Sequence, residues 1–147
     1  RRINAIASTF IARQAEQTGA HLIHISTDSV FDGTRGNYNE KDIPNPVNVY
    51  AKTKLEAEQK VMSILPAACI VRTVIYGWNY QNKFSLAEWI IHKLSHREKL
   101  RAFKDVLFSP ILVNDLAEIL RLYRFYRLRL PNLPENPVLI FQTLLWR

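Results

Sequence analysis

Glycine, cysteine and methionine are scarce in this sequence. Its four glycines, at positions 19, 33, 36 and 77 of 147 residues, are spaced too widely for a glycine-rich phosphate-binding turn. Its one cysteine, Cys69, lies in an apolar run that favours a buried thiol, and a single cysteine excludes an internal disulfide. No apolar run has the length that crosses a bilayer, and the start has no signal-peptide pattern. The sequence therefore predicts a soluble, cytoplasmic protein without a membrane partner.

The composition is that of a folded domain. Hydrophobic residues make up 48% of the chain and charged residues 22%, a balance that allows a single domain to bury a core. The sequence begins at Arg1 inside an apparent helix, and its one methionine is Met62. We therefore expect it to be a piece of a longer protein.

The net charge of +7 is concentrated near one end. Residues 121–147 carry five arginines and one glutamate, so more than half of the surplus lies in this segment. The rest of the chain has a charge that is ordinary for a globular domain, and we predict no nucleic-acid partner. A nucleic-acid-binding fragment driven by the arginines is the less favoured alternative. The histidines lack cysteine or carboxylate ligands at metal-binding spacing, so no metal site is expected.

Hydrophobic periodicity predicts alternating helices and strands. Helices are expected over 3–18, 47–65 and 84–96 and from residue 114, and extended segments over 21–25, 69–73 and 107–113. This order is typical of an α/β layer fold with parallel strands, in which functional groups gather at the C-terminal ends of the strands.

The helical patterns also predict which side chains are buried. In the first helix the apolar residues at helical spacing are Ile3, Ala7, Phe10, Ile11 and Ala15, and Gly19 follows as a helix-ending residue. In the second helix Val49 and Val61 belong to the apolar face, whereas Glu58 is expected in solvent.

A small chemical site is suggested where the first strand ends. The strand leads into Ser26 and Thr27, and the helix after it carries Tyr50 and Lys54 at positions i and i+4 of one face. A neighbouring cation favours the phenolate form of a tyrosine, and a hydroxyl from Thr27 or Ser26 could bond the same substrate oxygen. On spacing alone, such a Tyr and Lys pair is more often a solvated pair on a helix surface.

Four ordered segments add to this pattern. They are residues 25–33, 44–58, 71–77 and 108–117, which include Ser-Thr-Asp-Ser-Val-Phe-Asp-Gly and Tyr-Ala-Lys-Thr-Lys-Leu-Glu-Ala-Glu. Together they resemble the extended short-chain dehydrogenase/reductase family, and within it the dTDP-4-dehydrorhamnose reductases and their sugar-nucleotide relatives.

This resemblance implies an NADP- or NAD-dependent reductase or epimerase of a nucleotide-linked sugar. Tyr50 would donate a proton to a keto oxygen, Lys54 would favour ionisation of Tyr50 and hold the nicotinamide ribose, and Thr27 would orient the oxygen. The resemblance further assigns a cofactor-binding role to Ser26, Arg72 and Asn4, and a substrate-binding role to Asp28, Val74 and Tyr76, the last two from a turn over residues 72–77. A helix-start role is an equal alternative for Asn4.

The chain also departs from the family pattern. The glycine-rich turn is absent, so we expect residues 1–120 to be the C-terminal part of a Rossmann-like, doubly wound parallel domain that lacks its N-terminal βαβ units. Residues 121–147 are an atypical basic tail, read either as an altered substrate-binding lobe or as a terminal strand over 138–145. We expect weak or absent catalysis from this chain alone. A non-catalytic regulatory member of the superfamily is the alternative, and a homodimer of the intact protein stays open.

Overall fold

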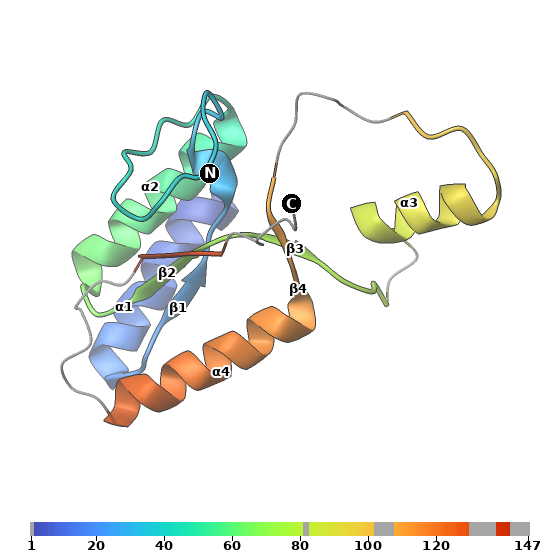
Figure 1. Ribbon diagram of the computed structural model, residues 1–147. Coiled ribbons are helices and arrows are strands. Elements are labelled where there is room, and N and C mark those ends of the chain that lie inside the picture. The colour runs from blue at the N-terminus through green and yellow to red at the C-terminus, as the bar shows by residue number, and fades with distance from the viewer. Residues whose placement is uncertain (1, 81–82, 102–107, 130–137, 142–147) are drawn as a thin grey trace. The chain divides into compact units, whose positions relative to one another are not determined.

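The computed structural model describes residues 2–80, 83–101, 108–129 and 138–141 (Figure 1). The chain divides into two compact units, one formed by residues 1–73 and 132–142 and the other by residues 74–131 and 143–147. The chain thus leaves the first unit after Thr73. The boundary predicted at residue 120 was based on where the family resemblance ends, and it stays a prediction.

The first unit is a three-stranded parallel sheet with helices. Along the chain it contains a π-helix η1 (Arg2–Ala7), α1 (Ser8–Thr18), β1 (Ile23–Ile25), a short 3-10 helix η2 (Asp28–Val30), α2 (Val49–Ile64), β2 (Cys69–Arg72) and β5 (Val138–Ile140). The strand order is β1-β2-β5, and Figure 1 shows α1 and α2 side by side. This confirms the predicted α/β fold with parallel strands.

The register of the strands brings polar residues to one edge of this sheet. Ile23 is opposite Cys69 and Ile25 is opposite Val71, and the Ser26 amide extends the ladder by donating to the Val71 carbonyl at 2.6 Å. Because the strands are parallel, the C-terminal ends of β1 and β2 lie next to each other.

Helix α1 packs through small side chains. Its buried residues are Ser8, Ala12 and Ala15, and Ala5 of η1 is buried as well. Of the predicted apolar residues Ala15 is buried, whereas the prediction was wrong for Ile3, Phe10 and Ile11, which are 83%, 61% and 57% exposed. Small side chains allow the neighbouring helix α2 to approach closely, which the larger residues would prevent.

The core of the first unit lies between the helices and the sheet. One cluster of fully buried side chains there is formed by Ala12, Val61, Ala68 and Ile70. Burial of Val61 was predicted correctly, whereas Val49, in the first turn of α2, is 78% exposed. The contact of α2 with this cluster is therefore made by Val61 in its C-terminal half, while Ala51 in its first half is also buried.

Two helix ends show how local sequence sets the element bounds. Gly19 ends α1 with a φ of 67°, a left-handed conformation that favours glycine, as predicted. The Asn48 side chain caps the start of α2 by accepting a hydrogen bond from the Ala51 amide at 2.8 Å. The cap explains why α2 begins at Val49 rather than at residue 47.

The second unit has a separate pair of parallel strands. It contains β3 (Val74–Tyr76), α3 (Leu86–Ser95), β4 (Pro110–Leu112) and α4 (Val113–Arg129), with β3 paired to β4. Residues 74–76, expected within a turn, therefore form a strand instead. Ser85 and Glu88 form a capping box that begins α3, and a side chain at Gly77 would meet Val113 at 2.6 Å.

Two interpretations were given for residues 121–147, an altered substrate-binding lobe and a terminal strand. The structure has a strand there, β5. Val138 and Leu139 of β5 pair with Ile70 and Val71 of β2. Residues 142–145 of the predicted strand lie outside the described residues. No helix among the described residues is long and apolar enough to span a membrane.

Candidate functional site

Lys54 reaches from α2 to the C-terminal end of β1. Its ammonium donates a hydrogen bond to the backbone carbonyl of Ile25 at 2.7 Å. An ammonium has three N–H donors, and within the part of the chain that the structure describes this is the one hydrogen bond that Lys54 makes. Two donors thus remain for another molecule at the end of the strand.

Thr27 lies immediately after this strand end and is almost completely buried, at 6% exposed. Its side-chain oxygen caps η2 by accepting from the Ser29 amide at 3.2 Å, and its hydroxyl lies 3.2 Å from the Ser29 hydroxyl. Burial raises the pKa of the neighbouring Asp28 carboxyl, and hydrogen bonds from Ser29 and Thr27 oppose that rise. The end of β1 therefore presents hydroxyl and carboxyl groups held in a tight turn.

Tyr50 lies on α2 one helical turn before Lys54. Its side chain is 54% exposed, and its hydroxyl makes no hydrogen bond to the described residues. The structure therefore brings Lys54 to the end of β1 and keeps the Tyr50 phenol available to solvent on the same helix.

Glu58, one turn after Lys54, is fully buried, so the prediction that it lies in solvent was wrong. Its carboxylate accepts hydrogen bonds from the guanidinium of Arg72, from Nη2 at 2.7 Å and from Nε at 3.2 Å. The Ser26 hydroxyl donates to the other carboxylate oxygen of Glu58. The signal in the sequence was its spacing, since Glu58 continues the stripe of Tyr50 and Lys54 along α2.

This network engages two residues that were predicted to bind cofactor. The side chains of Ser26 and Arg72 are 5% and 4% exposed, and both bond Glu58. Arg72 also lies over the Phe31 ring, 5.3 Å from its centroid. The polar atoms of these two side chains face the interior, and their cofactor-binding role stays a prediction.

Burial lowers the pKa values of both His24 and Lys54. Burial lowers the pKa of His24, as does the charge of Lys54, while Glu58 opposes the shift. Burial also lowers the pKa of Lys54, and again the Glu58 charge opposes it. The His24 Nε2 atom is buried with no hydrogen-bond partner in the described part of the chain, which favours the neutral ring.

The remaining predicted site residues lie in two places. Asn4 on η1 donates from its side-chain amide to the Thr53 hydroxyl at 3.1 Å, so it links η1 to the helix that carries Tyr50 and Lys54. Val74 and Tyr76 belong to β3 of the second unit, where Val74 is half-buried and Tyr76 is 38% exposed. Their substrate-binding role stays a prediction.

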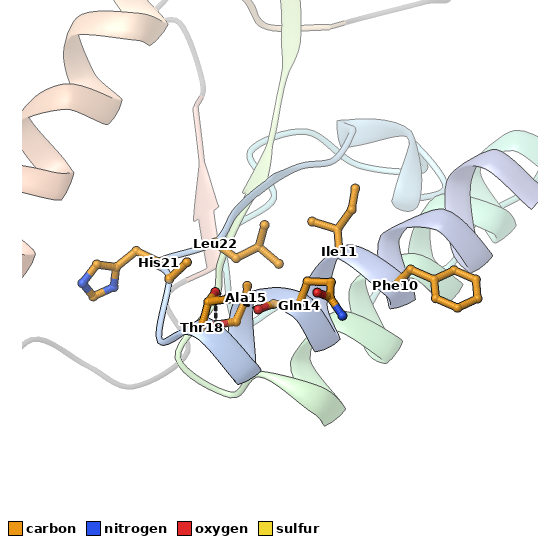
Figure 2. Close-up of a pocket in the computed structure, with 8 residues that line it drawn as sticks. Phe10, Ile11, Gln14, Ala15, Thr18, His21 and Leu22 are labelled. Atoms are coloured by element: carbon orange, nitrogen blue, oxygen red, sulfur yellow. Dashed lines mark hydrogen bonds between the residues drawn. The ribbon is translucent and has the colours of Figure 1, made fainter.

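A shallow apolar hollow lies at the opposite end of β1. Figure 2 shows Ile11 of α1 near Leu22, which precedes the strand, and Phe10 further along α1. Gln14, Ala15, Thr18, Ala20 and His21 complete its lining. The hollow lies at the other end of β1 from Thr27, and neither Tyr50 nor Lys54 belongs to its lining. Among the described residues no cluster of three or more histidine, cysteine or acidic side chains could hold a metal ion.

These features define a class of protein. A parallel α/β layer that presents a Ser-Thr-Asp turn beside a helix with Tyr50 and Lys54 is the arrangement of a Rossmann-like protein of the extended short-chain dehydrogenase/reductase kind. The sequence matches the family described as RmlD substrate binding domain over residues 1–124, and the chain belongs to this family.

Named relatives fall into two groups. The chain is 36% identical over 124 residues to dTDP-4-dehydrorhamnose reductase of Mycobacterium tuberculosis (strain CDC 1551 / Oshkosh), covering 80% of this chain and 40% of the relative. It is 50% identical over 76 residues to methionine adenosyltransferase 2 subunit beta of Bos taurus, covering 51% of this chain and 23% of the relative.

A solved structure agrees with this family. The crystal structure of dTDP-4-dehydrorhamnose reductase from Bacillus anthracis str. Ames in complex with NADP has a TM-score of 0.79 and 30% identity, covering 95% of this chain and 47% of that one. The chain therefore spans less than half the length of each relative named here.

Proposed function

We propose that the protein carrying this chain is an NADPH- or NADH-dependent reductase of a nucleotide-linked 4-keto sugar, such as dTDP-4-dehydrorhamnose. The observation that carries the proposal is the placement of Lys54 at the end of β1, next to Thr27 and one turn from Tyr50. Family membership and the reductases among the relatives support it.

The residues present fit the nicotinamide end of such a cofactor. The Lys54 ammonium keeps two donors for hydroxyl groups of a ribose, and the exposed Tyr50 hydroxyl is available to a second reactant. The relative from Bacillus anthracis was solved with NADP, which supports the same cofactor class. A glycine-rich turn for the pyrophosphate is absent from these 147 residues.

The bound cofactor would supply the hydride, and this chain would manage the proton. Tyr50 donates its hydroxyl proton to the keto oxygen as that oxygen gains negative charge, and the Lys54 charge stabilises the phenolate that remains. Thr27 donates a hydrogen bond to the same oxygen and so orients the carbonyl. Ser26, which follows β1, and Arg72 of β2 border this cofactor site, Asn4 supports α2 through Thr53, and Asp28 contacts the sugar nucleotide. A substrate-binding role for Val74 and Tyr76 is proposed from the family resemblance alone.

The test is a reductase assay of the full-length protein that contains this sequence. With dTDP-4-dehydrorhamnose and either NADPH or NADH, we expect the nicotinamide absorbance to fall and the reduced sugar nucleotide to appear. A matched reaction without the keto sugar controls for background oxidation. Absence of turnover with both cofactors would refute the proposal for this substrate.

A second candidate function is that of a regulatory subunit. The relatives named methionine adenosyltransferase 2 subunit beta reach 50% identity, although over fewer residues than the reductases match. A protein of that kind would retain the fold and bind an enzyme partner without turning over substrate itself.

Binding to a methionine adenosyltransferase distinguishes a regulatory subunit from a reductase. Size-exclusion chromatography of the full-length protein mixed with the catalytic methionine adenosyltransferase of the same source would yield a joint peak if it is a subunit. Tyr50→Phe would leave such a complex intact, whereas it would abolish most reductase turnover. Separate peaks would refute the subunit function.

A further inference from the structure

The buried carboxylate of Glu58 has no part in the proton transfer proposed above. It is 0% exposed, and it lies one helical turn after Lys54 and two after Tyr50. The three side chains therefore follow one stripe of α2, from the exposed phenol to the buried acid.

Burial of an ionised carboxylate is costly unless the charge is paired and its oxygens are bonded. Arg72 supplies the cation and two N–H donors, at 2.7 Å and 3.2 Å, and Ser26 supplies a hydroxyl donor. Arg72 is the last residue of β2 and Ser26 follows the last residue of β1. Glu58 therefore ties α2 to the C-terminal ends of both strands.

The same charge acts on Lys54. Burial lowers the pKa of the Lys54 ammonium, and the Glu58 charge counteracts this. The other titratable groups on the elements around Lys54 are Tyr50 on α2, His24 on β1, Asp28 on η2 and Arg72 on β2. Burial and the Lys54 charge lower the pKa of His24, which favours its neutral ring, so Glu58 is the acid that opposes the shift of Lys54.

We propose that Glu58 is a positioning residue of the reductase site, which ties α2 to the strand end that receives Lys54 and places a negative charge one helical turn from Lys54. The inference rests on the proposed function, because it assigns Lys54 to that reaction. Glu58 itself does not touch the substrate or the cofactor. Its action passes through Ser26, Arg72 and Lys54.

The ionisation of Lys54 tests this role in the full-length protein. The rate at which acetic anhydride acylates Lys54 is measured by mass spectrometry from neutral to alkaline pH, with the exposed Lys52 as an internal reference. In Glu58→Gln we expect the midpoint for Lys54 to move to lower pH while that of Lys52 stays, because a compensating negative charge has been removed.

Two variants separate charge from geometry. Ser26→Ala removes a hydrogen bond to Glu58 without changing any charge, and we expect the Lys54 midpoint to stay close to the wild-type value. Glu56→Gln removes an acid on the same helix that pairs with Lys60 at 2.8 Å, and it should also leave Lys54 unchanged. An equal shift in Ser26→Ala and Glu58→Gln would overturn the proposed role of the charge.

Loss of Glu58 leaves Arg72 buried without its partner, which can prevent folding. The double variant Glu58→Gln and Arg72→Met removes both charges and serves in that case. We expect Lys54 to shift to lower pH by a smaller amount than in Glu58→Gln, because loss of the Arg72 cation partly offsets loss of the Glu58 charge. A Lys54 midpoint that stays at the wild-type value in a folded variant without Glu58 would refute the proposal.

The acylation measurement needs no turnover, so the two hypotheses fail separately. Absence of reductase activity in the wild type would refute the proposed function, whereas an unmoved Lys54 midpoint would refute the role of Glu58. In an active enzyme we further expect Glu58→Gln to move the alkaline limit of kcat to lower pH and to leave KM for the sugar nucleotide nearly unchanged.

Discussion

The layer between α2 and the first sheet has an apolar half and a polar half. Toward the N-terminal ends of the strands, Val61 of α2 packs with Ile70 of β2 and with Ala68, which precedes that strand. Toward the C-terminal ends, Glu58 of α2 meets Ser26 and Arg72 instead. The same helix and strands thus pack through apolar side chains at one end and through a hydrogen-bonded ion pair at the other.

The transition occurs within one step along β2. Ile70 and Arg72 are two residues apart on this strand, so their side chains lie on the same face of the sheet. The difference teaches that the apolar half sets the stability of this unit, while the polar half places the groups that would do chemistry. Four changes test this division.

The largest effect is expected from Tyr50→Phe in the full-length protein. Only an exposed hydroxyl is lost, so the thermal unfolding midpoint should stay the same, whereas turnover should fall by roughly 10²–10⁴-fold because the proton donor is gone. Steady-state kinetics with dTDP-4-dehydrorhamnose would measure the loss, and calorimetry would supply the control. Wild-type turnover in this variant would remove Tyr50 from the mechanism.

Ile70→Ala, in contrast, should change the stability of the protein. Ile70 is fully buried in the apolar half, and its truncation should lower the free energy of unfolding by about 2–5 kcal/mol through lost burial and a cavity. Denaturant unfolding would measure this change, with Ile75→Ala at an exposed position as the control. A loss of stability no greater than that of the control would contradict the division between the two halves.

A smaller loss is expected when the start of α2 is uncapped. Asn48→Ala removes the acceptor of the Ala51 amide, and we expect the free energy of unfolding to fall by about 1 kcal/mol. Asn48→Asp keeps an acceptor and should restore most of the stability. If chemical denaturation gives equal values for the Ala and Asp variants, the cap does not stabilise α2.

The smallest effect concerns the pH dependence of stability. The pKa of His24 is lowered in the folded chain, so protonation favours the unfolded chain, and His24 should cost stability as the pH falls below its ordinary value of 6.5. His24→Gln should therefore flatten the pH dependence of the unfolding midpoint between neutral and mildly acid pH. The exposed His21→Gln is the control. An unchanged slope in His24→Gln would show that the buried ring does not contribute.

The order of helices and strands in this chain was predictable because it depends on local patterns. The periodicity of residues 47–65 and the run Cys69–Arg72 have the spacing and length of a helix and a buried strand, and Gly19 has a strong preference for a helix end. Family resemblance in the ordered segments predicted the match that residues 1–124 show.

The burial of Glu58 was not predictable from residue type, because an isolated glutamate on a helix is normally exposed. Its burial depends on Arg72, fourteen residues later and on a strand, and on the Ser26 hydroxyl at another strand end. The exposure of Ile3, Phe10 and Ile11 was missed for a related reason, since hydrophobicity alone cannot show that α1 packs through its alanines.

The alanine contact of α1 has a further consequence for evolution and engineering. Ala12 and Ala57 are both fully buried, one on each of two helices that lie against each other (Figure 1). A larger side chain at either position would push α2 away from its neighbours and carry Tyr50 and Lys54 with it. Alanines that carry no functional group thereby determine the position of Lys54 relative to the end of β1. Substitutions at such positions can change the activity of this unit without contacting a ligand.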